Sequence, residues 1–150
     1  MLQTKLRGTG GEFFTAFLLS AHWGMEVLIA DSEGFDLLAK DPKGRLPGKQ
    51  TKAISVKSRV RKDDKSLTFN IENSRRSLCR EAKAWNAEPY FAFLAFHRFE
   101  GEGQIHFMLV RACRENRHLF GPGTFKFRRA RRMKSTKHFR YFVLPLQEPQ

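Results

Sequence analysis

The run Tyr90–Phe99, YFAFLAFHRF, constrains the fold of this chain more than any other segment. It is almost continuously apolar and aromatic, which is typical of a strand buried on both faces rather than of a half-exposed strand with alternating polarity. Such a strand needs neighbours in a sheet and a layer of structure on each side of that sheet. The run therefore predicts a layered domain with this strand at its centre.

The segments before this run predict two helices with strands between them. Apolar residues recur at helical spacing over 11–23, and Asn73 is expected to cap a second helix that runs to about Asn86. Three strands are predicted between these helices, over 25–30, 35–40 and 52–59. A loop at 41–50 and a short extended stretch at 67–71 complete this part of the chain.

After the central run the pattern predicts a strand at 104–110, a short helix at 112–119 and basic extended segments to Leu144. The order αβββαβ, followed by a basic β extension, indicates an α/β (α+β) domain with a central mixed sheet flanked by helices. A length of 150 residues suits a single domain. We expect a core over about 10–110 and a basic, nucleic-acid-binding extension over about 111–150.

Positive charge is concentrated late in the chain. The 28 Lys and Arg outnumber the 15 Asp and Glu, which gives a net charge of +13, yet residues 1–50 hold six of each sign. The segment 126–140 alone holds eight basic residues and no acidic one. Because such charges repel one another unless an anion is present, we expect a nucleic acid as partner. A solvated basic face and an anionic membrane surface are weaker alternatives, since no amphipathic helix carries the cluster.

The predicted nucleic-acid contacts form two groups. Those of the C-terminal cluster are Lys126, Arg128, Arg129, Arg131, Arg132, Lys134, Lys137 and Arg140. Those expected to extend the positive surface towards the middle of the chain are Arg61, Lys62, Lys65, Arg75 and Arg76.

Composition also excludes several classes of protein. No apolar run approaches the roughly 18 residues of a membrane span, so we expect no membrane partner. Cys79 and Cys113 lie far apart without a CxxC motif, which argues against a disulfide framework and a zinc site and favours a reduced, cytoplasmic setting. Basic residues before the apolar run 13–19 loosely mimic a signal peptide, but Glu12 disfavours that interpretation.

Three ionisable residues stand where they could form one site. Glu12 is expected to open the first helix, Asp36 to begin the second strand, and Lys57 to lie on the third. A carboxylate pair that binds a hard cation beside a lysine is a minimal site for phosphodiester cleavage. Each residue also has a simpler explanation: a helix-dipole partner for Glu12, a turn residue for Asp36, and a solvated strand lysine for Lys57.

The segments Gly34–Ala39 (GFDLLA) and Ile54–Ser58 (ISVKS), in this order of elements, resemble the PD-(D/E)XK nuclease superfamily over roughly residues 10–100. The resemblance implies a restriction-endonuclease-like core that uses Mg²⁺, with Mn²⁺ as a substitute. It implies that Asp36 is the first metal carboxylate and Lys57 the catalytic lysine. It also implies that Glu12 supports the metal or the water and that the carbonyl of Val56 is a further metal ligand.

The sequence departs from the family pattern at Ser55, where a Glu, Asp or Gln is usual. A hydroxyl is a weak, neutral ligand for magnesium. Some restriction enzymes supply the missing carboxylate from a following helix, which makes Glu72 the predicted replacement and Glu81 a more distant option. Otherwise Gln50 or a water molecule fills the position, or the site is inactive.

These features together predict a metal-dependent DNA endonuclease of the restriction, homing or junction-resolving type. Duplex or branched DNA is the expected substrate, with RNA as an alternative, and the resemblance implies a homodimer or homotetramer. Two other hypotheses remain. The chain is a catalytically inactive protein of the nuclease fold that binds DNA or RNA, or it is a small basic ribonucleoprotein component whose motif is accidental.

Overall fold

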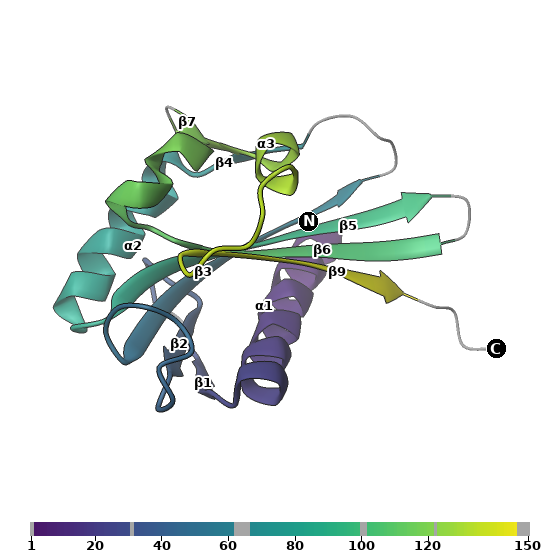
Figure 1. Cartoon of the computed structure of the whole chain (residues 1–150). Coiled ribbons are helices and arrows are strands. Elements are labelled where there is room, and N and C mark those ends of the chain that lie inside the picture. Colours follow the sequence, from purple (N-terminus) through teal and green to yellow (C-terminus); the bar gives the residue numbers. More distant parts are fainter. Residues whose placement is uncertain (1, 31, 62–66, 100–101, 122, 147–150) are drawn as a thin grey trace.

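The computed structural model describes residues 2–30, 32–61, 67–99, 102–121 and 123–146. A six-stranded sheet with the order β1-β2-β3-β5-β6-β9 forms its centre (Figure 1). The strands are β1 (Glu26–Ile29), β2 (Leu37–Lys40), β3 (Thr51–Arg61), β5 (Glu88–Phe99), β6 (Glu102–Arg111) and β9 (Phe139–Leu146). Strands β3 and β5 are parallel and the other neighbours antiparallel, so the sheet is mixed, as predicted.

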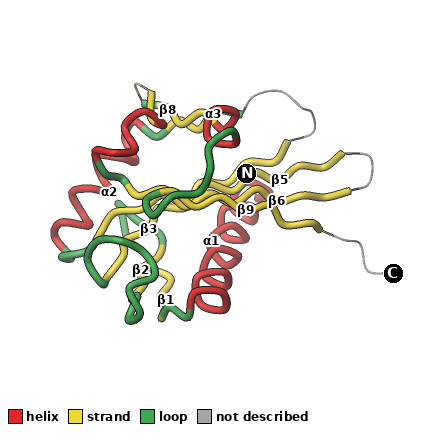
Figure 2. The backbone as a smooth tube through the Cα atoms, in the orientation of Figure 1, coloured by secondary structure: helices red, strands yellow, loops and turns green. Residues whose placement is uncertain are grey.

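Different layers cover the two faces of this sheet (Figures 1 and 2). The long helix α1 (Leu2–Trp23) lies on one face. The other face carries α2 (Glu72–Ala84), the short helical segments η1 (Arg114–Leu119) and α3 (Phe127–Arg131), and a small sheet of order β4-β8-β7. The strands of the small sheet are β4 (Thr68–Asn70), β7 (Phe120–Gly121) and β8 (Thr124–Lys126). The predicted fold class is therefore confirmed.

The apolar run of the sequence is β5, and it lies inside the sheet between β3 and β6. Phe91 and Phe93 belong to the core beneath α2, whereas Ala92 and Leu94 belong to the core beneath α1. All four are 0% exposed. Because successive side chains of a strand point to opposite faces, a strand that lies between two cores must be apolar at every position.

The first helix differs from the prediction. It begins at Leu2 rather than at Gly11, although the glycines in its first half have weak helix propensity. A Cβ atom at Gly11 would lie 3.1 Å from the hydroxyl oxygen of Ser58. The glycine therefore lets α1 approach β3 closely.

Two further boundaries differ from those that the sequence predicts. Helix α2 begins at Glu72, so Asn73 lies inside it; the side chain of Asn70 instead accepts a hydrogen bond from the N–H of Glu72 (3.3 Å). The sequence predicts an extended basic segment over 126–140, but α3 occupies part of it. The reason is that Phe127 and Ala130, one helical turn apart, are both buried in the core.

The C-terminal third is integrated into the domain. Strand β8 pairs with β4, and β9 pairs with β6 along eight residues, so that β9 forms one edge of the main sheet. The predicted extension over 111–150 thus contributes strands to both sheets. Within the described residues, no helix is both long and apolar enough to cross a membrane.

Candidate active site

Asp36 directly precedes β2, and backbone hydrogen bonds to the segments on either side of it fix its position. Its N–H donates to the carbonyl of Ile54 (2.9 Å), and its own carbonyl accepts a hydrogen bond from the N–H of Ala30 (2.8 Å). The carboxylate Oδ2 accepts a further hydrogen bond from the N–H of Val56 (2.7 Å). The side chain therefore occupies the position at the edge of β3 that the backbone of a neighbouring strand would otherwise take.

The carbonyl of Val56 shares this edge. The pairing of β2 with β3 extends from Lys40 and Thr51 to Leu37 and Ile54. After Ile54, the edge of β3 on this side is therefore next to Asp36 and not to a residue of β2. The N–H and C=O of one residue in an extended strand point to the same edge. The edge that binds Asp36 therefore also presents a backbone oxygen.

The electrostatic environment of Asp36 opposes its ionisation. Burial raises the pKa of Asp36 above its ordinary value of 3.8, and the hydrogen bond from Val56 and the charge of Lys57 offset only part of this rise. Partly desolvated carboxylates beside a cation are typical of functional sites. A bound cation would replace the solvation that this carboxylate has lost.

Lys57 and Ser55 share the face of β3 that is directed towards α2. Ala53, on the same face, lies in the core beneath α2, whereas Val56 lies against the core beneath α1. Ser55 is 3% exposed, and Lys57 is half-buried. The charge of Lys57 acts on Asp36, so the structure brings these two predicted residues together.

Glu12 lies well inside α1, because that helix begins at Leu2. The helix dipole acts within the first turn and therefore does not explain an acid at this position. Glu12 is half-buried and follows Gly11, which lies close to Ser58, the residue after Lys57. The structure thus places the backbone of Glu12 beside the part of β3 that carries the lysine.

The two candidates for the relocated acid lie on different sides of α2. Glu72 is exposed and packs against the turn at Gly123, where an added Cβ would lie 2.9 Å from the Cβ of Glu72. Glu81 packs against Gly34, where an added Cβ would lie 2.4 Å from its Cγ. Gly34 is two residues before Asp36, so Glu81 contacts the segment that carries the aspartate.

Within the part of the chain that the structure describes, no three His, Cys, Asp or Glu side chains are grouped to hold a metal ion. Mg²⁺ in nucleotide-processing sites is usually bound through one or two carboxylates, waters and substrate phosphates rather than by a complete protein cage. One carboxylate and one backbone carbonyl at the edge of β3 fit that mode of binding.

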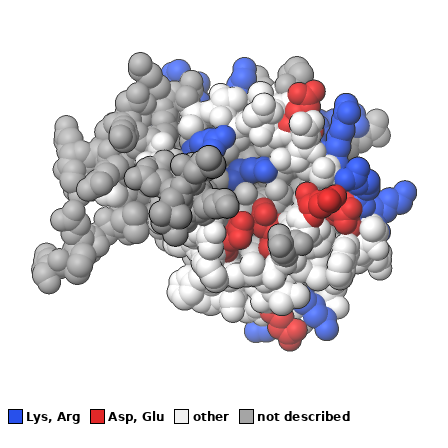
Figure 3. Space-filling view, turned by 180° about the vertical axis from the view of Figure 1, so that it is seen from behind, with Lys and Arg blue, Asp and Glu red and all other residues white. Residues whose placement is uncertain are grey.

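The C-terminal basic cluster lies on the same side of the main sheet as α2. Its members with described, exposed side chains are Lys126, Arg128, Arg131, Arg132, Lys134 and Lys137. Arg140 lies on the opposite side of the main sheet, because it is the register partner on β9 of Leu109, whose side chain lies in the core beneath α1. Lys62 lies outside the described residues, as does Lys65. Seen from behind, acidic and basic side chains lie beside one another rather than in one positive field (Figure 3).

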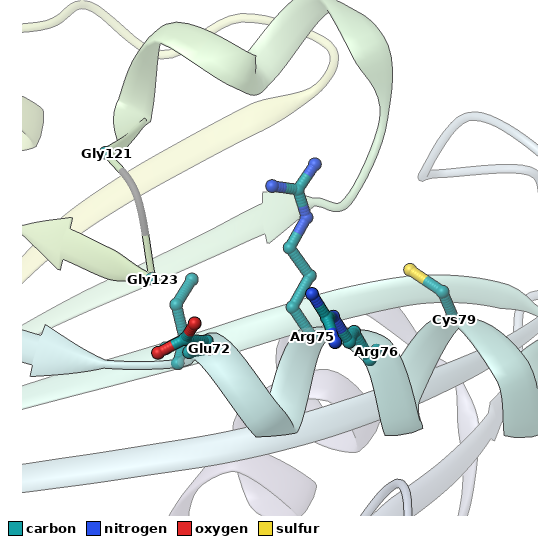
Figure 4. Close-up of a pocket in the computed structure, with 7 residues that line it drawn as sticks. Glu72, Arg75, Arg76, Cys79, Gly121 and Gly123 are labelled. Carbon is teal, nitrogen blue, oxygen red and sulfur yellow. The ribbon is translucent and has the colours of Figure 1, made fainter.

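Arg75 and Arg76 line a pocket of about 440 Å³ between α2 and the turn at Gly121 and Gly123 (Figure 4). The guanidinium of Arg75 lies 5.4 Å from the centre of the Phe120 ring. The pocket also contains Glu72, so it lies on the side of α2 away from Gly34. Sequence patterns do not reveal it, because α2 and the turn are some 40 residues apart in the chain.

Comparison of the sequence with protein-family models and with curated proteins gives no match. Among solved structures, the chain is similar to Hjc, a Holliday junction resolvase from the hyperthermophilic archaeon Archaeoglobus fulgidus. The TM-score is 0.52 at 17% identity, and the match covers 80% of this chain and 82% of the resolvase. The chain therefore has the restriction-endonuclease-like fold of that resolvase.

Proposed function

We propose that this chain is a metal-dependent endonuclease that cleaves phosphodiester bonds of branched DNA. The observation that carries the proposal is the partly desolvated carboxylate of Asp36, bonded to the N–H of Val56 and acted on by the charge of Lys57. This arrangement lies within the fold of a Holliday junction resolvase. The exposed basic residues of the C-terminal cluster would hold the phosphate backbone.

In the proposed mechanism Asp36 and the carbonyl of Val56 would hold Mg²⁺, for which Mn²⁺ could substitute. The ion would supply a water of lowered pKa and stabilise the negative charge that develops on the phosphate. Lys57 donates hydrogen bonds to the attacking water and to the phosphate, and its positive charge stabilises the transition state. Glu12 would approach the water from α1, which covers the opposite face of the sheet, and Ser55 would contribute a neutral hydroxyl.

A cleavage assay tests this proposal directly. A four-way DNA junction and a linear duplex of the same sequence are incubated with the protein in Mg²⁺, in Mn²⁺ or in EDTA. We expect metal-dependent cuts near the branch point and slower cutting of the duplex. Lys57→Met should lower the rate by about 10²–10³-fold, as is typical for the loss of one group that stabilises developing charge.

Lys40→Met is the matched control for Lys57→Met. Lys40 is exposed at the far end of β2, so its loss removes the same charge without touching the edge at Asp36. Equal activity of the Lys57 and Lys40 variants would contradict the assigned role of the lysine. Cleavage that continues unchanged in EDTA would contradict metal dependence.

The second acid is tested by a pair of variants. The sequence predicts Glu72, whereas the close approach to Gly34 favours Glu81. We therefore expect Glu81→Gln to lower cleavage strongly and Glu72→Gln to leave it nearly unchanged. The reverse result would return the role to Glu72, and full activity in both variants would mean that Asp36 needs no second carboxylate from α2.

A second candidate function is binding of DNA or RNA without cleavage. It is favoured by Ser55, which replaces a carboxylate and is 3% exposed, and by the absence of a three-residue acidic group within the described residues. Tight, salt-sensitive binding without cleavage in any metal would support this candidate.

Because paired cuts need two active sites, the nuclease proposal also includes a homodimer or homotetramer, which light scattering of the purified protein tests.

A further inference from the structure

The loop between β2 and β3 presents a cluster of positive charge to which the proposed cleavage mechanism gives no role. Lys43, Arg45 and Lys49 are exposed within the ten residues 41–50. The one acid of this segment, Asp41, is 2% exposed. The loop therefore exposes three basic side chains to solvent while its single acidic side chain is buried, although the first third of the chain is neutral as a whole.

Asp41 is used to shape the loop from within. Its two carboxylate oxygens accept hydrogen bonds from the N–H groups of Arg45 (3.0 Å) and Leu46 (2.8 Å). Leu46 is 2% exposed and belongs to the core beneath α1. A buried anchor directly after Arg45 fixes the direction in which the tip of the loop projects.

Lys52 and Tyr90 hold the returning half of the loop. Lys52 is 0% exposed, and its Nζ donates to the carbonyl of Pro47 (3.2 Å) and to that of Lys49. The hydroxyl of Tyr90 donates to the same carbonyl of Pro47 (2.8 Å). Burial of a lysine is costly unless hydrogen bonds compensate, and here the compensating acceptors are carbonyls of the loop itself.

A third anchor lies at Glu88. Its Oε2 accepts a hydrogen bond from the N–H of Lys49 (3.2 Å), and its Oε1 forms an ion pair with Arg111 (2.9 Å). Glu88 is therefore engaged and does not neutralise the cations at the tip. The other acid nearby, Glu26 on β1, is paired in register with Lys40 and lies outside the loop.

We propose that this preorganised loop, through Lys43 and Arg45, binds the phosphate backbone of a DNA arm at a distance from the cleavage site. The inference rests on the proposed function and specifies how its substrate is held. Thr51, where the loop joins β3, is six residues from Lys57, or about 20 Å along an extended strand. At about 3.4 Å per base pair, that distance corresponds to roughly six base pairs of duplex. Because the loop is ordered before binding, little conformational entropy is lost when DNA binds.

The test is equilibrium binding in EDTA, where no cleavage occurs, to a four-way junction and to a 30-base-pair duplex between 50 and 200 mM salt. Lys43→Ala/Arg45→Ala is compared with Lys83→Ala/Arg117→Ala, which removes the same charge from exposed positions on α2 and η1. The slope of log K against log salt changes by about 0.9 for each phosphate that the protein no longer neutralises. We expect the loop variant to reduce the slope by about 1.8 and the control to leave it unchanged.

A second measurement detects the interaction without any substitution. Acetylation of lysines in the wild-type protein, followed by mass spectrometry, should show protection of Lys43 by the bound duplex and no protection of Lys83. Equal slopes for the two double variants, or equal acetylation of Lys43 with and without DNA, would overturn the inference while leaving cleavage by the wild type intact. Failure of the wild type to bind either DNA would instead overturn the proposed function, and the inference with it.

Discussion

Replacement of Asp36 separates its structural role from its chemical role. Asp36→Asn keeps an oxygen that can accept the hydrogen bond from Val56 and removes the charge that burial disfavours. Asp36→Ala removes both and leaves the N–H of Val56 without its partner. The two variants therefore differ in a single hydrogen bond to the edge of β3.

The magnitude follows from that bond. An unsatisfied, half-buried N–H costs about 1–3 kcal/mol, so Asp36→Ala should be less stable than Asp36→Asn by about 2 kcal/mol. For a domain of this size, about 4 °C in Tm corresponds to 1 kcal/mol, which gives a difference of roughly 8 °C. Both variants should lose cleavage by at least about 10³-fold, because each lacks the metal carboxylate.

The stability of the wild type relative to Asp36→Asn should depend on pH. The pKa of Asp36 in the folded protein is raised, so the folded state binds its proton more tightly than the unfolded state does. The charged carboxylate therefore destabilises the wild type at neutral pH. The difference in stability between the wild type and Asp36→Asn should disappear as the pH falls through the raised pKa towards the ordinary value of 3.8.

Thermal unfolding of the three proteins at pH 7 and at acidic pH, with and without Mg²⁺, provides the measurement. Mg²⁺ should raise the Tm of the wild type and of neither variant. The reasoning is refuted if Asp36→Ala is as stable as Asp36→Asn, or if Asp36→Asn is less stable than the wild type at neutral pH in EDTA.

Three other substitutions test the surroundings of the site. Gly34→Ala should lower the free energy of unfolding by about 1–3 kcal/mol, because the added Cβ would lie 2.5 Å from the carbonyl oxygen of Ser77. An unchanged midpoint of urea denaturation would contradict this close approach. Phe125→Ala should lower the free energy of unfolding by about 3–5 kcal/mol, since the Phe125 side chain is 0% exposed and its ring stacks on that of Phe93 with 3.8 Å between the ring centres. A loss of less than about 1 kcal/mol would mean that the small sheet is not packed against the main sheet at this position. Ser55→Asp should lower the Tm in EDTA and show a larger rise in Mn²⁺ than the wild type; no such rise would argue against a metal at this edge.

Much of the fold could be predicted because its signals are local. The strand predicted at 52–59 lies within β3, and the pair formed by Asp36 and Lys57 lies on two short segments that the sequence singles out. Helix boundaries are less predictable. Glycines at 8, 10 and 11 weaken helix propensity, yet α1 runs through them, and only Gly11 packs closely against Ser58, which is a tertiary effect.

The sequence by itself determined a central strand, since only burial on both faces accounts for the composition of β5. It also determined which ionisable residues could meet at the start of β2. Only the tertiary structure decided that Glu81 rather than Glu72 packs against the segment of Asp36, because helical period alone does not say which side of α2 faces that segment. The same holds for the loop 41–50: its charges are visible in the sequence, but the burial of Asp41 and Lys52 that orders them depends on hydrogen bonds with Leu46, Pro47 and Tyr90 in the folded domain.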